Sequence, residues 1–149
     1  MSGDLAFANV LDRIEVAMAS GPELRSYVVN RFTPGLYIRE CGFEAGTQGV
    51  TMIHAIDHPF FILKGDVEVI SETEGVTRYV GPCMGITKCG TRRLLKAHAD
   101  TVWITVHPNP NNETDIEKIV ARITQPHENP AVPADKANMW RRNQTVRIE

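Results

Sequence analysis

The chain has 149 residues, of which 42% are hydrophobic and 23% are charged, and its formal net charge is −2. This length fits one domain with a real core, and this composition is ordinary for a soluble globular protein. The charge argues against a protein that holds nucleic acid mainly by electrostatics, and the apolar runs are too short for a transmembrane helix.

The N-terminus and the cysteines bear on the cellular compartment. The first residues lack the positively charged start and the continuous apolar core of a signal peptide. Cys41, Cys83 and Cys89 are an odd number of cysteines without CxxC spacing, which indicates neither a disulfide framework nor a zinc knuckle. We therefore expect a protein of the reducing cytoplasm with no membrane or nucleic-acid partner.

The first predicted element is a helix over about residues 5–20. Apolar residues recur there at the spacing of one helical stripe, which comprises Phe7, Val10, Leu11, Ile14 and Met18. Asp4 is the expected N-cap, and Gly21-Pro22 ends the helix. We expect the helix to pack on a β core, and the alternative is a helix that binds a partner.

Residues 28–107 form a succession of short candidate strands separated by turns. The candidates are 36–43, 49–55, 59–65, 66–72, 75–81, 84–90, 92–98 and 100–107. Short strands at close, regular spacing, without a helical pattern between them, are typical of an antiparallel sandwich or barrel. The residues expected in its core are Phe61, Leu63, Val67 or Val69, and 102–106.

A second helix is predicted after residue 113. Thr114 and Glu117 match a capping box, in which each side chain satisfies an exposed backbone donor of the other residue. An apolar stripe follows, made of Ile116, Ile119, Val120 and Ile123. The helix is thus expected to bury one face against the β core.

The segment after the second helix is predicted to be an extended arm. It has three prolines and few core-type residues. Trp140 and Ile148 have no obvious place in a closed core. We therefore expect a homo-oligomer in which the segment after Gln125 crosses onto a neighbouring subunit.

Two histidines lie four residues apart in the stretch MIHAIDHPFFILKGDVEV, residues 52–69. Side chains alternate along a strand, so Met52 and His54 share one face, while His58 follows a turn and opens the next strand. Two adjacent strands can then aim His54 and His58 at one point. Imidazole nitrogens suit transition metals, and the alternative is a polar pair hydrogen-bonded at a barrel mouth.

The spacing around these histidines resembles the first motif of the cupin superfamily. That motif is Gly, five residues, His, one residue, His, three or four residues, Glu, six residues, Gly. The corresponding residues here are Gly46, Met52, His54, His58 and Gly65. His54 matches the second histidine, whereas Met52 stands at the first histidine and His58 at the glutamate.

The segment GITKCGTRRLL resembles the second cupin motif, which is Gly, five residues, Pro, one residue, Gly, two residues, His, three residues, Asn. Gly90 matches the second glycine. Lys88 stands at the proline, Arg93 at the histidine and Ala97 at the asparagine, and the first glycine would fall on Pro82. By this resemblance, the chain keeps one of the family's metal ligands, has a residue able to ligate in place of a second, and lacks the other two.

The resemblance spans about residues 36–107 and implies an all-β fold. It predicts a single-domain cupin-type double-stranded β-helix, a jelly-roll barrel, with an N-terminal helix and a C-terminal helix plus extended arm. The N-terminal helix is expected in residues 1–27, the barrel in 28–107, and the C-terminal helix and arm in 108–149, all in one domain. The amino-acid sequence also resembles those of small cupin-like proteins of tailed phages and prophages, a group without settled activity. This resemblance implies a phage or prophage origin.

A metal at the two histidines would need a third ligand. His98 and His107 both lie in later strands, and His98 is our candidate because it closely follows the second motif. The resemblance then implies one divalent transition metal, Fe, Zn, Ni or Mn. Met52 is a candidate ligand-binding residue because its thioether would face His54.

Arg93 is the most informative departure from the motif. An arginine that points into a small barrel needs an anionic partner, because an unpaired buried guanidinium is costly. Candidate partners are a carboxylate of the chain (Asp57, Glu68 or Asp100) or a bound phosphate or carboxylate. An internal salt bridge and a solvent-facing Arg92-Arg93 pair are the alternatives. Lys88 carries the same ambiguity.

Two functions are therefore open. In the first, the barrel binds a metal ion or a small anionic ligand at His54, His58 and Arg93, and any catalysis would be metal-assisted chemistry on a small anionic substrate. In the second, the chain is a non-catalytic phage structural or interaction protein that has kept the barrel without the chemistry. The sequence names no specific reaction.

Overall fold

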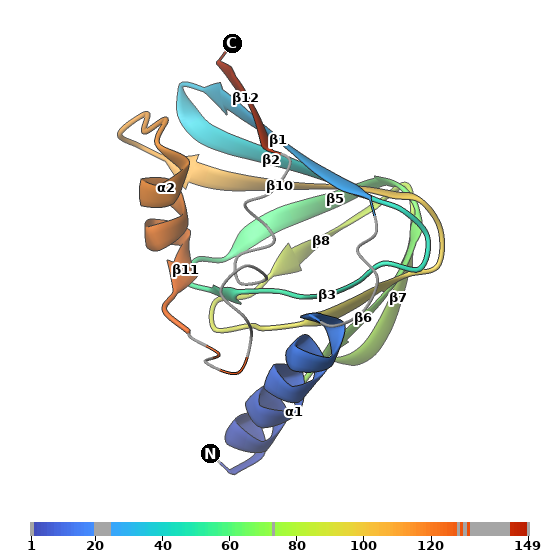
Figure 1. Ribbon diagram of the computed structural model, residues 1–149. Helices are drawn as coiled ribbons and strands as arrows, with labels where there is room; N and C mark the ends of the chain where they lie inside the picture. The colour runs from blue at the N-terminus through green and yellow to red at the C-terminus, as the bar shows by residue number, and fades with distance from the viewer. Residues whose placement is uncertain are drawn as a thin grey trace.

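The fold is mostly β-strand, as seen in a computed structural model that describes residues 2–19, 25–72, 74–127, 129, 131 and 144–148 (Figure 1). Its helices are α1 (Ser2–Ala19) and α2 (Ile116–Ile123). Its strands are β1 (Ser26–Thr33), β2 (Gly35–Phe43), β3 (Gln48–Val50), β4 (Ile53–His54), β5 (His58–Lys64), β6 (Asp66–Ser71), β7 (Gly75–Val80), β8 (Cys83–Thr87), β9 (Leu94–Ala97), β10 (Thr101–Asn109), β11 (Thr124–Gln125) and β12 (Gln144–Ile148).

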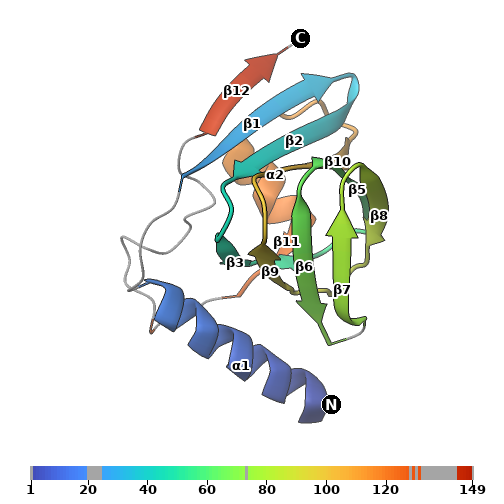
Figure 2. The ribbon, with the colours of Figure 1, turned by 90° about the vertical axis from the view of Figure 1, so that its right-hand side faces the viewer.

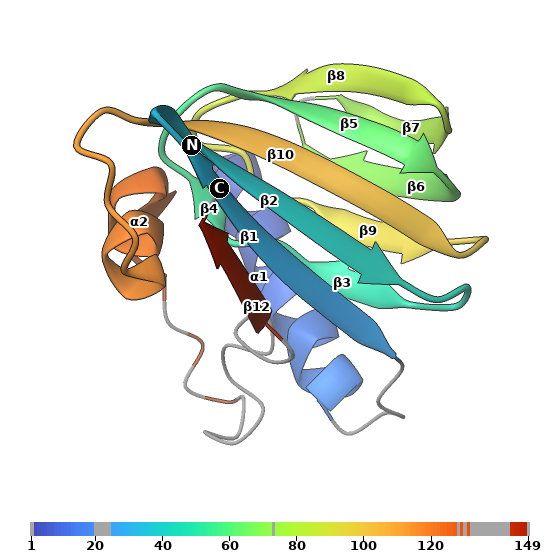
Figure 3. The same cartoon turned by 90° about the horizontal axis from the view of Figure 1, so that it is seen from above.

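The strands form two main sheets. One has six strands in the order β12-β1-β2-β10-β5-β8, and the other has four in the order β3-β9-β6-β7. Every pair within residues 26–125 is antiparallel, so the predicted antiparallel sandwich is confirmed. In Figure 3 the six-stranded sheet lies over the four-stranded sheet, and no described strand pairs across from one to the other, so the jelly roll is an open barrel.

The main core lies between the sheets. Phe60 and Ile62 of β5 pack there with Val67 and Val69 of β6 and with Trp103 of β10. Gly85 on β8 makes room for Phe60, because a Cβ at Gly85 would come within 2.5 Å of that ring. The predicted core residues Val67, Val69 and the aromatic Trp103 are therefore confirmed.

The predicted side-chain alternation of β5 is wrong by one residue. The strand begins at His58, which is buried, so every second residue from His58 faces inward. Phe61 and Leu63 consequently face outward, and Leu63 is 54% exposed. The prediction took both as core residues because the run PFFILK is apolar on both faces, which hides its period.

A second core cluster lies under α2 at one end of the sheets. Ile119 and Ile123 pack there on Phe32 and Tyr37, which confirms the predicted apolar stripe. The predicted capping residue is wrong: Asp115, not Thr114, is the N-cap, and its side chain accepts a hydrogen bond from the backbone N–H of Glu117. An aspartate at this position satisfies the exposed donor directly.

Helix α1 lies below the four-stranded sheet and contacts its edge strand β3 (Figure 2). Leu11 is buried beneath it, whereas Val10, which was placed on the same stripe, is 40% exposed. The helix begins at Ser2, so Asp4 lies inside it and is not its N-cap. The barrel holds α1 by an ion pair in which Arg92 Nη1 lies 2.7 Å from Asp12 Oδ1.

The C-terminal segment contributes one strand to a small separate sheet and one strand to the six-stranded sheet. β11 pairs with β4, and β12 runs parallel to β1 of the same chain, on the edge of the six-stranded sheet. The strand β1 was not among the predicted strands. Trp140 lies outside the described residues, and the crossing of the arm onto a neighbouring subunit stays a prediction.

Candidate functional site

Three histidines meet in the interior, close to the end of the sheets that α2 covers. His54 comes from β4, His58 opens β5, and His107 lies near the end of β10. The ring centroids of His54 and His58 are 4.8 Å apart, and those of His58 and His107 are 4.3 Å apart. The structure thus brings the two predicted histidines together and adds His107 to them.

Each of the three rings has a buried nitrogen without a hydrogen-bond partner among the described residues. These atoms are His54 Nδ1, His58 Nε2 and His107 Nδ1. The other nitrogen is held in two of the rings: His58 Nδ1 lies 2.9 Å from the Ile56 carbonyl oxygen, and His107 Nε2 lies 2.9 Å from Thr105 Oγ1. Such outer contacts fix how an imidazole presents its remaining nitrogen.

The three imidazoles are neutral at physiological pH. Burial, together with smaller electrostatic contributions from His58 and Arg93, lowers the pKa of His54 to about 3. Burial also lowers the pKa of His107 to about 2. Burial lowers the pKa of His58, with a contribution from Arg93, although the hydrogen bond to Ile56 opposes the shift. Each ring therefore offers one donor and one acceptor nitrogen.

Arg93 points into the same interior and is only 4% exposed. Its backbone is held by two hydrogen bonds with Thr51, one to the hydroxyl and one from the amide. The guanidinium lies over the rings of Phe60 and Trp103, with its Cζ 5.4 and 5.7 Å from their centroids. Nη2 donates to Thr87 Oγ1 at 2.6 Å, while Nε has no partner among the described residues.

No carboxylate within the described ranges forms an ion pair with Arg93, and the three predicted partners are engaged elsewhere. Asp57 accepts hydrogen bonds from the Cys89 amide and from Lys88. Glu68 lies 3.7 Å from His98, and Asp100 accepts from the Ala45 amide. Burial lowers the pKa of the Arg93 guanidinium, and the charge of the exposed Glu74 only partly offsets this. Arg93 is therefore a buried cation that forms no ion pair with the described carboxylates, an arrangement that is costly in an empty protein.

The remaining predicted site residues lie apart from this cluster or at its margin. Lys88 is exposed and its Nζ is 3.4 Å from Asp57 Oδ2. His98 is 41% exposed at its side chain and follows β9, at the opposite end of that strand from Arg93. Met52 is partly buried in the irregular stretch between β3 and β4. The expected continuous strand over residues 49–55 is therefore broken at residues 51–52.

Imidazole is the right kind of ligand for a transition metal. Within the described part of the chain, no group of three or more His, Cys, Asp or Glu side chains is arranged to hold a metal ion. The donor types at His54, His58 and His107 fit a metal, whereas their present orientation does not.

Sequence reasoning considered His107 but preferred His98 as the third histidine, and it missed Thr87. His107 lies four residues after the core residue Trp103, so strand alternation places both side chains on the same face. That signal was present in the sequence. Thr87 gave no such signal, because its role depends on Arg93, which reaches it from outside the β5–β8 ladder.

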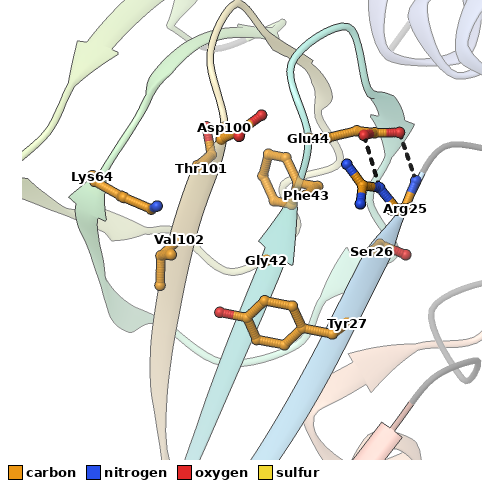
Figure 4. Close-up of a pocket in the computed structure, with 10 residues that line it drawn as sticks. All are labelled: Arg25, Ser26, Tyr27, Gly42, Phe43, Glu44, Lys64, Asp100, Thr101 and Val102. Atoms are coloured by element: carbon orange, nitrogen blue, oxygen red, sulfur yellow. Dashed lines mark hydrogen bonds and ion pairs between the residues drawn. The ribbon is translucent and has the colours of Figure 1, made fainter.

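A separate open pocket of about 280 Å³ lies on the outer face of the six-stranded sheet. Tyr27, Gly42, Val102 and Lys64 form a cross-strand row in it. Figure 4 shows the Arg25–Glu44 ion pair at its rim. None of the residues predicted to bind a ligand or metal lines this pocket.

Comparisons with known proteins identify the fold. No family model matches the chain, and no curated protein matches it. The structure of the EutQ protein from Clostridium difficile is 13% identical with a TM-score of 0.50, and the match covers 62% of this chain and 75% of that chain. A cupin superfamily protein from Desulfitobacterium hafniense is 9% identical with a TM-score of 0.50, covering 62% of this chain and 85% of that chain.

These likenesses show that the chain has the fold of cupin superfamily proteins, and at such low identity they show the fold alone. Neither described helix has the length and apolar character needed to cross a membrane.

Proposed function

We propose that this protein is a small cupin-like protein that binds a small anionic ligand, a carboxylate or a phosphate, between its two sheets. The observation that carries the proposal is Arg93, a buried guanidinium whose Nε has no partner among the described residues and which forms no ion pair with a described carboxylate. Arginine binds carboxylates and phosphates through two parallel hydrogen bonds, which makes it suited to this role.

The charge of the cluster favours an anion over a cation. Arg93 is positive, and its charge helps to lower the pKa values of the neutral imidazoles of His54 and His58. Burial is the main cause of these lowered pKa values, but the positive charge of Arg93 adds to it, and that charge disfavours a metal cation and attracts an anion. An anion beside Arg93 would supply the missing counter-charge and offset the cost of burying the guanidinium.

A single divalent transition metal, Fe, Zn, Ni or Mn, is the second candidate. It is supported by the three neutral imidazoles, each with a buried ring nitrogen that has no described partner. His54, His58 and His107 would hold such an ion after their rings turn, and the ion would act as a Lewis acid toward a bound anion. His98, our original third ligand, would have to leave the surface to take part.

Thermal unfolding with a panel of small anions tests the first candidate. We expect acetate, glycolate or phosphate at millimolar concentration to raise the melting temperature of the metal-free protein, because ligands that bind only the native state stabilise it. Lys88→Met is the matched control, since this cation is exposed and paired with Asp57. It should keep the stabilisation, whereas Arg93→Met should abolish it.

Metal analysis of protein purified without a histidine tag tests the second candidate. One equivalent of a transition metal, lost in His54→Ala and retained in His98→Ala, would favour the metal over the anion. A protein that holds no metal and whose melting temperature responds to no anion would move us to the alternative function, a non-catalytic structural or interaction protein.

The proposed origin is a phage or prophage, with the protein acting in the cytoplasm of the host. It is supported by the resemblance of the stretch around His54 and His58 to small phage-encoded cupin-like proteins. Both functions above are compatible with this origin, so it does not decide between them.

We also propose a homo-oligomer, and the edge strand β8 supports it. β8 is the last strand of the six-stranded sheet, and residues 83–87 include no charged side chain that would protect the edge. Met84 and Ile86 are 58% and 46% exposed. Two β8 strands paired antiparallel about Gly85 would set Met84 of one copy against Ile86 of the other.

Light scattering of wild type and Met84→Lys tests this assembly. We expect the wild type to be a dimer and Met84→Lys to be a monomer, because a lysine on the edge opposes pairing. Val76→Lys, on the exposed side of β7, is the control and should remain dimeric. A monomeric wild type would contradict the proposal.

A further inference from the structure

His58 presents a fixed acceptor to the interior. Its Nδ1 lies 2.9 Å from the carbonyl oxygen of Ile56, and a carbonyl can only accept, so Nδ1 carries the proton. Burial lowers the pKa of this ring, so it is neutral at pH 7 and Nε2 holds a lone pair. Nε2 is buried and has no partner among the described residues.

His58 and Arg93 are held against the same two strands. His58 lies directly opposite Thr87 in the antiparallel ladder of β5 and β8, and directly opposed side chains on one face are close neighbours. Arg93 Nη2 donates to the hydroxyl of that same Thr87 at 2.6 Å. The free donor Arg93 Nε and the free acceptor His58 Nε2 therefore face one region of the interior.

The other two histidines do not impose the same requirement. His107 Nε2 contacts the hydroxyl of Thr105, which either donates or accepts, so the proton on His107 is not fixed. The structure assigns no carbonyl or carboxylate partner to His54 among the described contacts. His58 is thus the side chain of the cluster whose hydrogen-bonding role is settled by its surroundings.

Resting on the proposed anion binding, we infer that the ligand is a small oxyanion that also carries a hydroxyl group, as a hydroxy carboxylate or a hydrogen phosphate does. The oxyanion would accept from Arg93 Nε, and the hydroxyl would donate to His58 Nε2. A ligand without the hydroxyl would leave this buried acceptor unsatisfied, which costs affinity. His58 is then a specificity-determining residue of the site.

Matched ligand pairs test the inference on the full-length, metal-free protein. Glycolate and acetate differ by one hydroxyl, and at pH 8 hydrogen phosphate and sulfate have the same charge and also differ by one hydroxyl. We expect glycolate to bind at least roughly 10-fold more tightly than acetate, the effect of one unsatisfied buried acceptor. The pair with the larger ratio tells whether the oxyanion is a carboxylate or a phosphate.

His58→Asn is the decisive variant. The amide of asparagine retains a donor for the Ile56 carbonyl but has no atom at the position of Nε2. We expect the glycolate-to-acetate ratio to fall to about one while acetate still binds, since Arg93 is unchanged. His98→Asn, at an exposed histidine, is the matched control and should keep the wild-type ratio.

A measurement on the wild type avoids dependence on the folding of a variant. In ¹⁵N NMR spectra, His58 Nε2 should appear as a nitrogen without a proton in the free protein and should shift when glycolate, but not acetate, is added. Equal affinities within both matched pairs would overturn the inference and leave the proposed function standing. Binding of none of the four anions would overturn both.

Discussion

Arg92 and Arg93 are neighbours in the chain and both are buried, yet they are opposites in their electrostatics. Arg92 points outward from the barrel to α1, where its Nη1 lies 2.7 Å from Asp12 and its Nη2 lies 3.6 Å from Glu15. Arg93 points inward among aromatic and imidazole rings, without a carboxylate partner in the described residues. One cation is neutralised by the chain, and the other is not.

This difference indicates a structural role for Arg92 and a functional role for Arg93. Arg92, Asp12 and Glu15, which we call the latch, hold α1 against the barrel. His127 also contacts the latch, with its Nε2 2.9 Å from Asp12 Oδ1. The inner cluster of Arg93 and the three histidines does not hold elements together in this way. Four of its buried polar atoms have no described partner. Unsatisfied buried polar groups reduce stability unless another molecule satisfies them.

The largest expected effect is a loss of stability in mild acid that comes from the inner cluster. The unfolded chain takes up histidine protons near pH 6.5, whereas the native His54 and His107 do so only near their lowered pKa values of about 3 and about 2. The unfolded state therefore binds more protons as the pH falls below 6.5, and stability decreases. Between pH 7 and pH 5 each ring costs about 2 kcal/mol.

Urea unfolding at pH 7 and pH 5 measures this loss, which we expect to be about 4 kcal/mol or more with His58 included. His107→Gln should reduce the loss by about 2 kcal/mol, and His98→Gln should not change it. The latch affects stability at lower pH values. Burial raises the pKa of Asp12, but hydrogen bonds from Arg92 and His127 outweigh this and lower the pKa. Its stabilisation is lost only as the pH falls below 3.8. An unchanged stability down to pH 4 would contradict the comparison.

The next effect is that of Arg92→Met. Removing the guanidinium leaves Asp12 and Glu15 without their cation at a mostly buried contact. We expect the free energy of unfolding to fall by about 2 kcal/mol, the cost of losing a charged hydrogen bond with a partly buried partner. Urea unfolding at pH 7 measures it, and a neutral outcome would mean that α1 is not held by this latch.

The smallest effect on stability is expected for Arg93→Met. Methionine retains apolar contact with Phe60 and Trp103 and removes a buried charge that has no counter-charge, so the stability should stay within about 1 kcal/mol of wild type or rise. The same unfolding experiment applies. A loss as large as that of Arg92→Met would show that Arg93 has a stabilising partner and would remove the contrast between the two arginines.

The fold could be predicted from the sequence where the local pattern has one period. The alternating strand 66–72 and the apolar stripe of α2 gave the correct buried residues because each has one polar and one apolar face. The strand β5 did not, since its run is apolar on both faces and the buried His58 sets the alternation. The pairing of β12 with β1 joins the two ends of the chain, and no local pattern carries such information.

The site could be predicted in part. The motif spacing pointed to His54, His58 and Arg93, and the structure places all three in one interior cluster. It favoured His98 over His107 as the third histidine, whereas the structure buries His107 and exposes His98, because the choice depends on which face of two separate strands is buried. Lys88 shared the motif with Arg93 but lies in solvent with Asp57, since it falls just past the end of β8.

The most direct test of the central claim is the affinity of the two arginine variants for one anion. Titration of wild type, Arg92→Met and Arg93→Met with glycolate, followed by NMR, compares two equal changes in charge at adjacent residues. We predict that Arg92→Met binds glycolate as the wild type does, despite its lower stability, and that Arg93→Met does not bind it. Retained binding in Arg93→Met, or equal loss in both variants, would contradict the assignment of Arg93 as the anion-binding residue.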